Sequence, residues 1–244
     1  MIATTLPVSA QTLAAREKCR RMVALLIGRP VSWPGPVRES GEEVARGVAF
    51  HRLVQRHRLG MEARATGQLA ELWQKFNRSP YFETRGAIFT ERILQFSLDG
   101  VPFQARLDEV RQDGDQWTIL DWKTGPLKET SLAFQPQTRL YRFALARAGS
   151  ALNAGKPISP TNIKMVYWLV GLEKPIAIPY DQAAFEADQR FFAEVAREAK
   201  EPLSALPWPE SADACYTCRF DSYCNPRPAR IVSIPEPSLP RFAL

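Results

Sequence analysis

The middle of the chain alternates apolar and polar side chains in three runs, which two tight turns separate. The first run, Ile88–Gln95, leads to Asp99-Gly100, a strong signal for a two-residue hairpin turn. The second run is Val101–Val110, and a turn at residues 112–116 separates it from the third, Trp117–Lys123. A period of two is typical of strands with one buried face. This part of the chain therefore predicts an antiparallel meander of three strands.

Helical periodicity occupies much of the chain on either side of the meander. We expect helices, in chain order, after Pro7–Ala10 and around Cys19, from Gly41 through Val54, from Met61 to about Phe76, from about Phe134 to Arg147 and over Asp181–Lys200. A further strand is expected at Ile163–Leu169. This order implies an α/β fold with a central mixed β-sheet flanked by helices. Residues 29–40 are Pro-rich and predict a loop. Residues 1–225 are expected to form one domain, followed by a Pro-rich C-terminal tail at 226–244.

The composition is that of an ordinary globular protein, with 45% hydrophobic and 24% charged residues. The longest apolar run, Met22–Ile27, falls far short of the roughly 20 residues that a membrane-spanning helix needs. No secretory signal is recognisable at the N-terminus, so we expect a cytoplasmic protein without a membrane association. The net charge of +6 suits a polyanionic partner, although many basic proteins bind no nucleic acid.

Two carboxylates and a lysine gather in the second and third expected strands. Asp121 and Lys123 are two residues apart and therefore share one face of their strand. Asp108 shares the outward face of the preceding strand with Arg106 and Gln104, and the hairpin can bring it beside the other two. An ordinary surface salt bridge is the simplest explanation of Asp-x-Lys alone. Together, two carboxylates and an ammonium suit Mg²⁺ binding and phosphodiester hydrolysis.

The four cysteines are clustered in a way that suggests one metal site. Cys215, Cys218 and Cys224 lie within ten residues as Cys-x2-Cys-x5-Cys, and Cys19 stands far upstream. Four thiolates fit one closed site, whereas four unrelated thiols would not explain this grouping. Spacing alone leaves zinc and an iron–sulfur cluster as alternatives.

Four short motifs together resemble the PD-(D/E)XK nuclease superfamily, specifically its RecB-like branch. In chain order they are Gly47-Val-Ala-Phe-His51, Arg106-Leu-Asp108, Asp121-Trp-Lys-Thr-Gly125 and Gln137-Thr-Arg-Leu-Tyr141. The resemblance spans the chain from about Val8 to Cys224 and implies a restriction-endonuclease-like core.

The resemblance also implies roles for individual residues. The metal ligands for Mg²⁺ or Mn²⁺ would be His51, Asp108, Asp121 and the main-chain carbonyl of Trp122. Lys123 would position the attacking water and offset negative charge. A lone inward histidine is otherwise more often a core residue than a ligand.

Substrate contacts are implied for Gln137 and Tyr141, which are one helical turn apart. Glu91, in the first expected strand, is a further candidate because related enzymes often carry a glutamate nearby. The expected activity is that of a metal-dependent DNA nuclease, an exonuclease on single-stranded DNA or duplex ends in repair, recombination or defence. A helicase or another repair or adaptation protein is an expected partner. The alternative is a non-catalytic DNA-binding or scaffold subunit of such a complex.

The cysteine arrangement resembles that of iron–sulfur nucleases, including the AddB nuclease domain and the CRISPR-associated adaptation exonuclease. The opening stretch Ser9–Cys19 resembles theirs too, but Arg20 stands where a proline commonly follows the cysteine. The resemblance implies a [4Fe-4S] cluster, with zinc as the alternative occupant. The cluster would join the N- and C-terminal segments through Cys19, Cys215, Cys218 and Cys224.

Overall fold

The computed structural model describes residues 6–28, 41–83, 85–125, 132–216 and 218–225. The loop predicted at residues 29–40 and the tail predicted at 226–244 lie outside these ranges.

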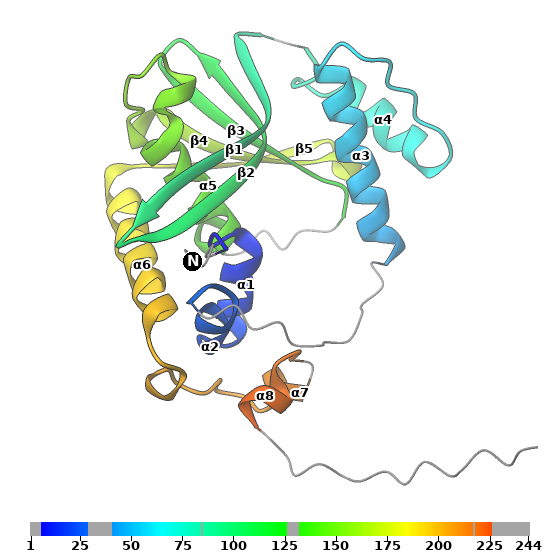
Figure 1. Ribbon diagram of the computed structural model, residues 1–244. Coiled ribbons are helices and arrows are strands. Elements are labelled where there is room, and N and C mark those ends of the chain that lie inside the picture. The colour runs from blue at the N-terminus through cyan, green and yellow to red at the C-terminus, as the bar shows by residue number, and fades with distance from the viewer. Residues whose placement is uncertain (1–5, 29–40, 84, 126–131, 217, 226–244) are drawn as a thin grey trace, which may run out of the picture.

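A five-stranded mixed sheet forms the centre of the fold, with its strands in the order β1-β2-β3-β4-β5 (Figure 1). The strands are β1 (Ala87–Leu98), β2 (Val101–Asp113), β3 (Gln116–Lys123), β4 (Ile163–Leu169) and β5 (Lys174–Pro179). The predicted meander is confirmed, since β1, β2 and β3 pair antiparallel in sequence. Asp99 and Gly100 both have positive φ at the first turn, at 49° and 76°, as a tight hairpin requires. β4 then pairs parallel with β3 through a helical crossover.

Helices cover both faces of this sheet. In chain order they are α1 (Ala10–Lys18), α2 (Arg21–Val23), α3 (Glu42–Arg58), α4 (Gln68–Asn77), α5 (Pro136–Ala148), α6 (Gln182–Lys200), α7 (Asp213–Tyr216) and α8 (Asp221–Cys224). A π-helical turn, η1 (Ala24–Gly28), continues α2. Short 3₁₀ turns are η2 (Leu132–Phe134), η3 (Gly149–Leu152), η4 (Pro160–Asn162), η5 (Val170–Leu172) and η6 (Leu203–Ala205). The α/β architecture expected from the sequence, a mixed sheet flanked by helices, is therefore confirmed.

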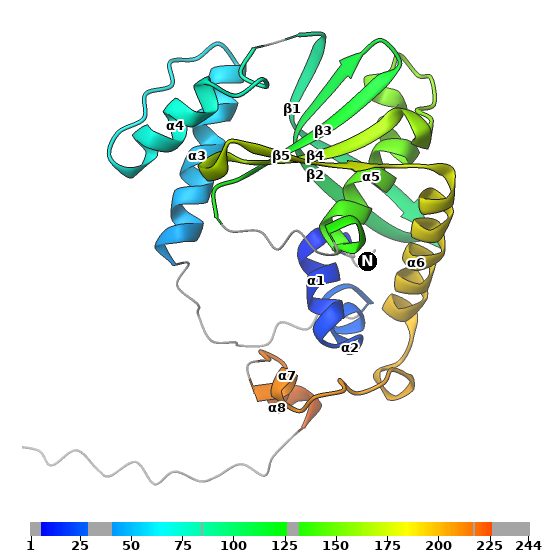
Figure 2. The same cartoon turned by 180° about the vertical axis from the view of Figure 1, so that it is seen from behind.

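The two faces of the sheet bury separate apolar clusters. The larger cluster lies under α1, α5 and α6 and includes Phe103, Phe143 and Phe192, all fully buried. The smaller cluster lies under α3 and α4 and includes Phe50, Phe76 and Trp122. Figures 1 and 2 show α3 and α4 on one side of the sheet and α1, α5 and α6 toward the other. The tryptophans of β3 and β4, Trp117, Trp122 and Trp168, are all buried in the core.

Two details differ from the sequence prediction. The helix expected from Met61 begins only at Gln68, where the chain leaves Gly67 at a φ of 57°. Strand β5 was not predicted, because it is short and carries Pro175 and Pro179, which usually argue against a strand. It pairs at the edge of the sheet, where a missing N–H donor is tolerated.

The alternation of side chains between the two faces of the sheet is interrupted in β2 at Asp108. Leu107 and Val110 are three residues apart, yet both are buried in the larger cluster. Glu109, between them, is fully buried beside Arg58 of α3, on the face of the smaller cluster. Pairing with β3 runs only as far as Glu109 and Leu120, so the two strands separate at Asp108. The sheet therefore opens where the predicted carboxylates lie.

No helix in the described ranges is long and apolar enough to cross a membrane.

Candidate active site

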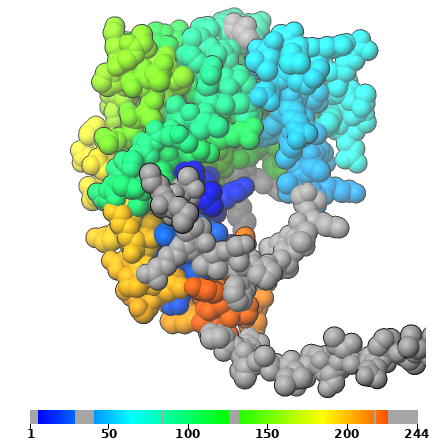
Figure 3. Space-filling view, in the orientation of Figure 1, coloured from blue at the N-terminus to red at the C-terminus, as the bar shows by residue number. Residues whose placement is uncertain are grey.

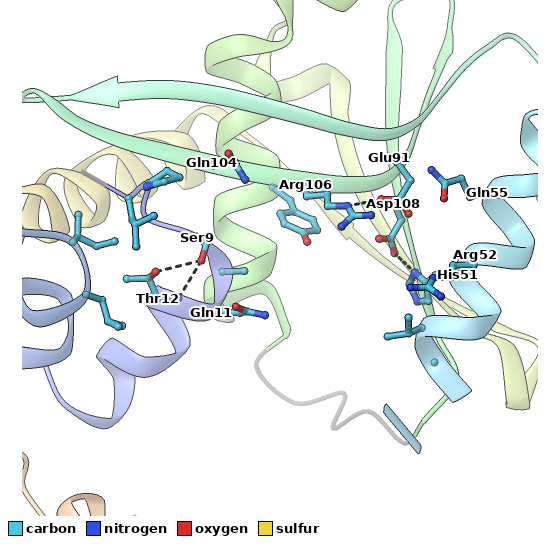
Figure 4. Close-up of a pocket in the computed structure, with 18 residues that line it drawn as sticks. Ser9, Gln11, Thr12, His51, Arg52, Gln55, Glu91, Gln104, Arg106 and Asp108 are labelled. Atoms are coloured by element: carbon cyan, nitrogen blue, oxygen red, sulfur yellow. Dashed lines mark hydrogen bonds and ion pairs between the residues drawn. The ribbon is translucent and has the colours of Figure 1, made fainter. Parts of the chain in front are cut away.

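A cavity of about 1000 Å³ lies between α3, the β1–β2 ribbon and the segment that begins α1. Figure 3 shows the surface hollowed between the α3 side of the molecule and the body formed by the sheet and α1. Its wall includes His51, Arg52, Glu91, Gln104, Arg106 and Asp108 (Figure 4). The predicted shared face of Gln104, Arg106 and Asp108 therefore opens onto this cavity.

Asp121 is the buried centre of the predicted trio, with a side chain that is 2% exposed. Lys123 Nζ lies 2.6 Å from Asp121 Oδ1, which confirms that the two side chains share a face. Gln137 of α5 donates from Nε2 to Asp121 Oδ2 at 2.6 Å and accepts from Lys123 through Oε1 at 3.4 Å. Helix α5, which follows β3 in the sequence, thus holds both the Asp121 carboxylate and the Lys123 ammonium through Gln137.

His51 connects α3 to the point where the strands separate. Its Nε2 lies 2.8 Å from the carbonyl oxygen of Trp122, and its Nδ1 lies 3.2 Å from Asp108 Oδ2. Asp108 Oδ2 also accepts from the main-chain N–H of Trp122 at 3.4 Å. Both partners of the imidazole are oxygen acceptors, and the tautomer and protonation of the ring decide which nitrogen donates. His51, Asp108 and the Trp122 carbonyl form one connected group.

The charges of this group shift its pKa values. Burial raises the pKa of Asp121, and the charge of Asp108 raises it further, whereas Lys123 and His51 lower it, with a result of about 6. Burial lowers the pKa of His51, but the hydrogen bond and charge of Asp108 and the charge of Asp121 outweigh burial and raise it. Perturbed titratable groups that share a cavity are typical of functional sites.

Tyr141 lies one turn beyond Gln137 on α5 and lines the cavity, although only 8% of it is exposed. Burial raises the pKa of its hydroxyl, and Asp121 and Asp108 raise it further. The hydroxyl therefore stays protonated near neutral pH and can act as a hydrogen-bond donor.

Glu91 lies across the β1–β2 ladder from Asp108. The ladder pairs Thr90 with Glu109 and Arg92 with Leu107, which leaves Glu91 and Asp108 as the interrupted step. Glu91 has a φ of 51°, a left-handed conformation that non-glycine residues adopt uncommonly. Its carboxylate lines the cavity and binds Arg106.

The possible donors to a divalent metal ion are His51, Asp108, Asp121 and the carbonyl oxygen of Trp122. Among the described residues, no three His, Cys, Asp or Glu side chains are close enough together to hold a metal ion. The chemistry of the donors nevertheless fits a hard cation, because carboxylate and carbonyl oxygens predominate. Asp121 Oδ1 is buried and, despite the nearby ammonium, has no hydrogen-bond partner in the described part of the chain.

A buried ion-pair network lies behind the site, and no motif in the sequence predicts it. Glu109, fully buried, pairs with Arg58 Nε at 2.8 Å and with Arg111 Nε at 2.6 Å. Arg58 also donates to the carbonyls of Phe82 and Tyr81. This network fixes the last turn of α3, the helix that carries His51, against β2.

The four cysteines all line one small cavity between α1–α2 and the C-terminal segment. Figures 1 and 2 both place α7 and α8 beside α2. None of the four forms a disulfide, and burial raises the pKa of the Cys19 thiol. Phe220 N donates to Cys218 Sγ at 3.4 Å. Cysteines from opposite ends of the chain thus line one cavity, although no three of them are close enough in the described residues to hold a metal ion. Thiolates as a residue type suit zinc or an iron–sulfur cluster.

Comparison with known proteins gives one family and a distant structural likeness. The family model described as the PD-(D/E)XK nuclease superfamily matches residues 7–225. A solved structure from Eubacterium rectale, described as a "Putative exonuclease", is similar with a TM-score of 0.53 and 12% identity, covering 93% of this chain and 91% of that one. The crystal structure of SSO0001 matches with a TM-score of 0.33 and 14% identity, over 79% of this chain and 90% of that one. No curated protein matches the chain.

Proposed function

The chain belongs to the PD-(D/E)XK nuclease superfamily, and we propose that it is a metal-dependent deoxyribonuclease of the RecB-like branch. Its catalytic residues would be Asp108, Asp121 and Lys123. Residues 1–225 would act as a single nuclease domain. The observation that carries this proposal is the opening between β2 and β3, where Asp108 lines a cavity of about 1000 Å³ and the paired Asp121 and Lys123 lie on the adjoining strand.

Each residue has a task that its position supports. Lys123, held between Asp121 and Gln137, would orient the attacking water and offset the negative charge that develops on the phosphate oxygens. The water oxygen forms the new P–O bond, the bond to the leaving oxygen breaks, and the leaving oxygen takes up a proton. Tyr141 and Gln137 would hold the scissile phosphate from the α5 side.

A Mg²⁺ or Mn²⁺ ion held by His51, Asp108, Asp121 and the Trp122 carbonyl would supply Lewis-acid stabilisation when bound. The chain's own contribution is to keep these donors on three rigid elements. Asp108 and Trp122 are tied by a hydrogen bond, and His51 reaches both from α3. Asp121 remains buried beneath them.

We assign the cysteine cavity to a [4Fe-4S] cluster with a structural role. The observation that supports the proposal is that Cys19, Cys215, Cys218 and Cys224 line one small cavity, and its occupant would connect α1 to the segment that follows α6. Elemental analysis of anaerobically purified protein tests the assignment. About four iron atoms per chain are expected, and zinc without iron would overturn it.

Exonuclease action on single-stranded DNA or on duplex ends is the activity that we propose. One solved structure with a similar fold is described as a "Putative exonuclease", and Asp108 and His51 lie at the wall of the cavity. A role in repair, recombination or defence, with a helicase or an adaptation protein as partner, is the corresponding proposal for its setting.

The decisive experiment uses end-labelled single- and double-stranded DNA with Mg²⁺, Mn²⁺ or EDTA. We expect metal-dependent products that shorten from one end. Asp121→Asn and Lys123→Ala should abolish them, whereas Lys164→Ala, an exposed lysine on β4, should not. Wild-type protein that binds DNA but cuts none with any metal would favour a non-catalytic scaffold.

A further inference from the structure

Arg106 differs from the arginines that hold the fold together. The guanidinium groups of Arg58 and Arg111 are nearly buried, and each contacts Glu109 and main-chain carbonyls. Arg106 is 66% exposed and lies at the wall of the active-site cavity. In the described ranges its side chain makes a single contact, from Nε to Glu91 Oε2 at 2.6 Å.

The geometry of that contact leaves most of the guanidinium available. An arginine carries five N–H donors in a planar fork, and Glu91 occupies only the one on Nε. The two terminal nitrogens therefore keep four N–H groups for an external anion. Paired N–H groups of this kind match the oxygens of a phosphate, which arginine can bind in a bidentate way.

Glu91 is well placed to orient this fork. Its side chain is only 13% exposed, and its left-handed backbone stands at the step where the β1–β2 ladder is interrupted opposite Asp108. Backbone strain at a cavity wall persists only where the surroundings enforce it, and it is common at functional sites. Figure 4 shows Glu91 and Arg106 joined by a contact beside Asp108.

We propose that Arg106 binds the backbone phosphate next to the scissile one, and that Glu91 is the positioning residue that aims its guanidinium. This inference rests on the proposed nuclease function and specifies how the site holds its substrate strand. Arg106 and Asp108 are two residues apart, so their main chains lie roughly 7 Å from each other along β2. That separation suits neighbouring phosphates of one extended strand. Gln104, two residues further and also on the cavity wall, continues the same polar path.

A phosphate contact of this kind reads no base sequence, because backbone oxygens are the same at every nucleotide. It contributes instead to affinity, and this contribution depends on salt because binding releases counterions. For a single strand, each neutralised phosphate contributes about 0.7 to the slope of log K against log salt. Loss of Arg106 should therefore reduce the magnitude of the slope by about 0.7.

The test measures binding separately from cleavage. Fluorescence anisotropy of a labelled single-stranded oligonucleotide is followed in EDTA over a series of salt concentrations. We expect Arg106→Gln to weaken binding by about tenfold at low salt. It should also reduce the magnitude of the slope of log K against log salt by about 0.7. Arg106→Lys should keep the slope of log K against log salt, because lysine keeps the positive charge. It should bind more weakly than wild type, because lysine lacks the planar set of N–H donors of the guanidinium. Arg92→Gln is the matched control, because Arg92 is exposed on β1 and lies outside the wall of the cavity.

The role of Glu91 is tested by a double-mutant cycle. Glu91→Gln should leave the salt slope unchanged and raise KM for a short oligonucleotide more than it lowers kcat. In an Arg106→Gln background the same substitution should have no further effect, because the residue that it orients is gone. Equal effects of Glu91→Gln in both backgrounds would overturn its positioning role.

The outcomes separate this inference from the proposed function. If the wild type cuts DNA and Arg106→Gln keeps the wild-type slope, the assignment of Arg106 is wrong and the nuclease proposal stands. If the wild type neither cuts nor binds DNA, both are wrong. Circular dichroism and thermal melting of each variant, compared with Arg92→Gln, identify any loss of folding.

Discussion

Replacement of Glu109 by alanine tests whether the network behind the active site holds the fold and aligns the catalytic helix. Glu109 is fully buried between Arg58, which is 1% exposed, and Arg111, which is 12% exposed. Removing one partner of a buried ion pair costs about 3–5 kcal/mol, because the remaining charge is left without compensation. Both arginines keep main-chain acceptors at Tyr81 and its neighbours, so we expect the lower end, about 3 kcal/mol.

This loss is large against the roughly 5–15 kcal/mol by which a typical domain is stable. Urea unfolding followed by tryptophan fluorescence gives the measurement. With a slope of about 2 kcal/mol per M, the midpoint should fall by roughly 1.5 M. Glu109→Gln, which keeps the shape and an acceptor oxygen, should lose less.

The same variant should also lower kcat. Arg58 is the last residue of α3 and stands two turns beyond His51, so a loosened helix end misplaces the imidazole. The control is Glu173→Ala, which removes an exposed ion pair with Arg78 and should leave the midpoint unchanged. If Glu109→Ala unfolds at the same urea concentration as this control, the network does not stabilise the protein and the reasoning fails.

Three further predictions concern the backbone, pH and the cysteine cavity. Gly86→Ala should lower the melting temperature, because Gly86 has a φ of 71° and a Cβ there would lie 2.1 Å from the Gln112 carbonyl oxygen; an unchanged melting temperature would contradict this. Burial and the charge of Arg58 lower the pKa of His57, so its stabilising contribution is present above about pH 6.5 and is lost as the pH falls through the folded-state pKa. Urea midpoints at pH 7.5 and 5 should therefore differ less in His57→Gln than in the wild type. Cys218→Ser should lose bound iron and melt earlier, and a variant that retains full metal content would show that Cys218 is not a ligand.

The elements of this protein follow largely from local patterns in its sequence. A period of two predicts the meander, and the turn at Asp99-Gly100 sets its register, because only that pairing buries the apolar side chains. The same parity places Asp121 and Lys123 on one face, where the structure has them. The grouping of cysteines predicts a shared metal site, which stays a prediction, and the four residues line one cavity.

Other features depend on contacts between distant parts of the chain. Strict alternation would place Leu107 and Glu109 on one face, yet buried Arg58 pairs with Glu109 on the opposite side of the sheet, and β2 and β3 separate at Asp108. No local pattern predicts the burial of Glu109, because its partner Arg58 lies on α3, far away in the sequence.

The carboxylate–lysine site shows both contributions. Its residue types and their spacing along β3 were already determined by the sequence, since the geometry of a strand is local. The positions of His51 and Gln137 were decided only by packing, which brings α3 and α5 to the end of β3 from different parts of the chain. The sequence by itself determined which groups could act, and the tertiary structure decided which of them meet, because burial and long-range pairing are properties of the folded chain alone.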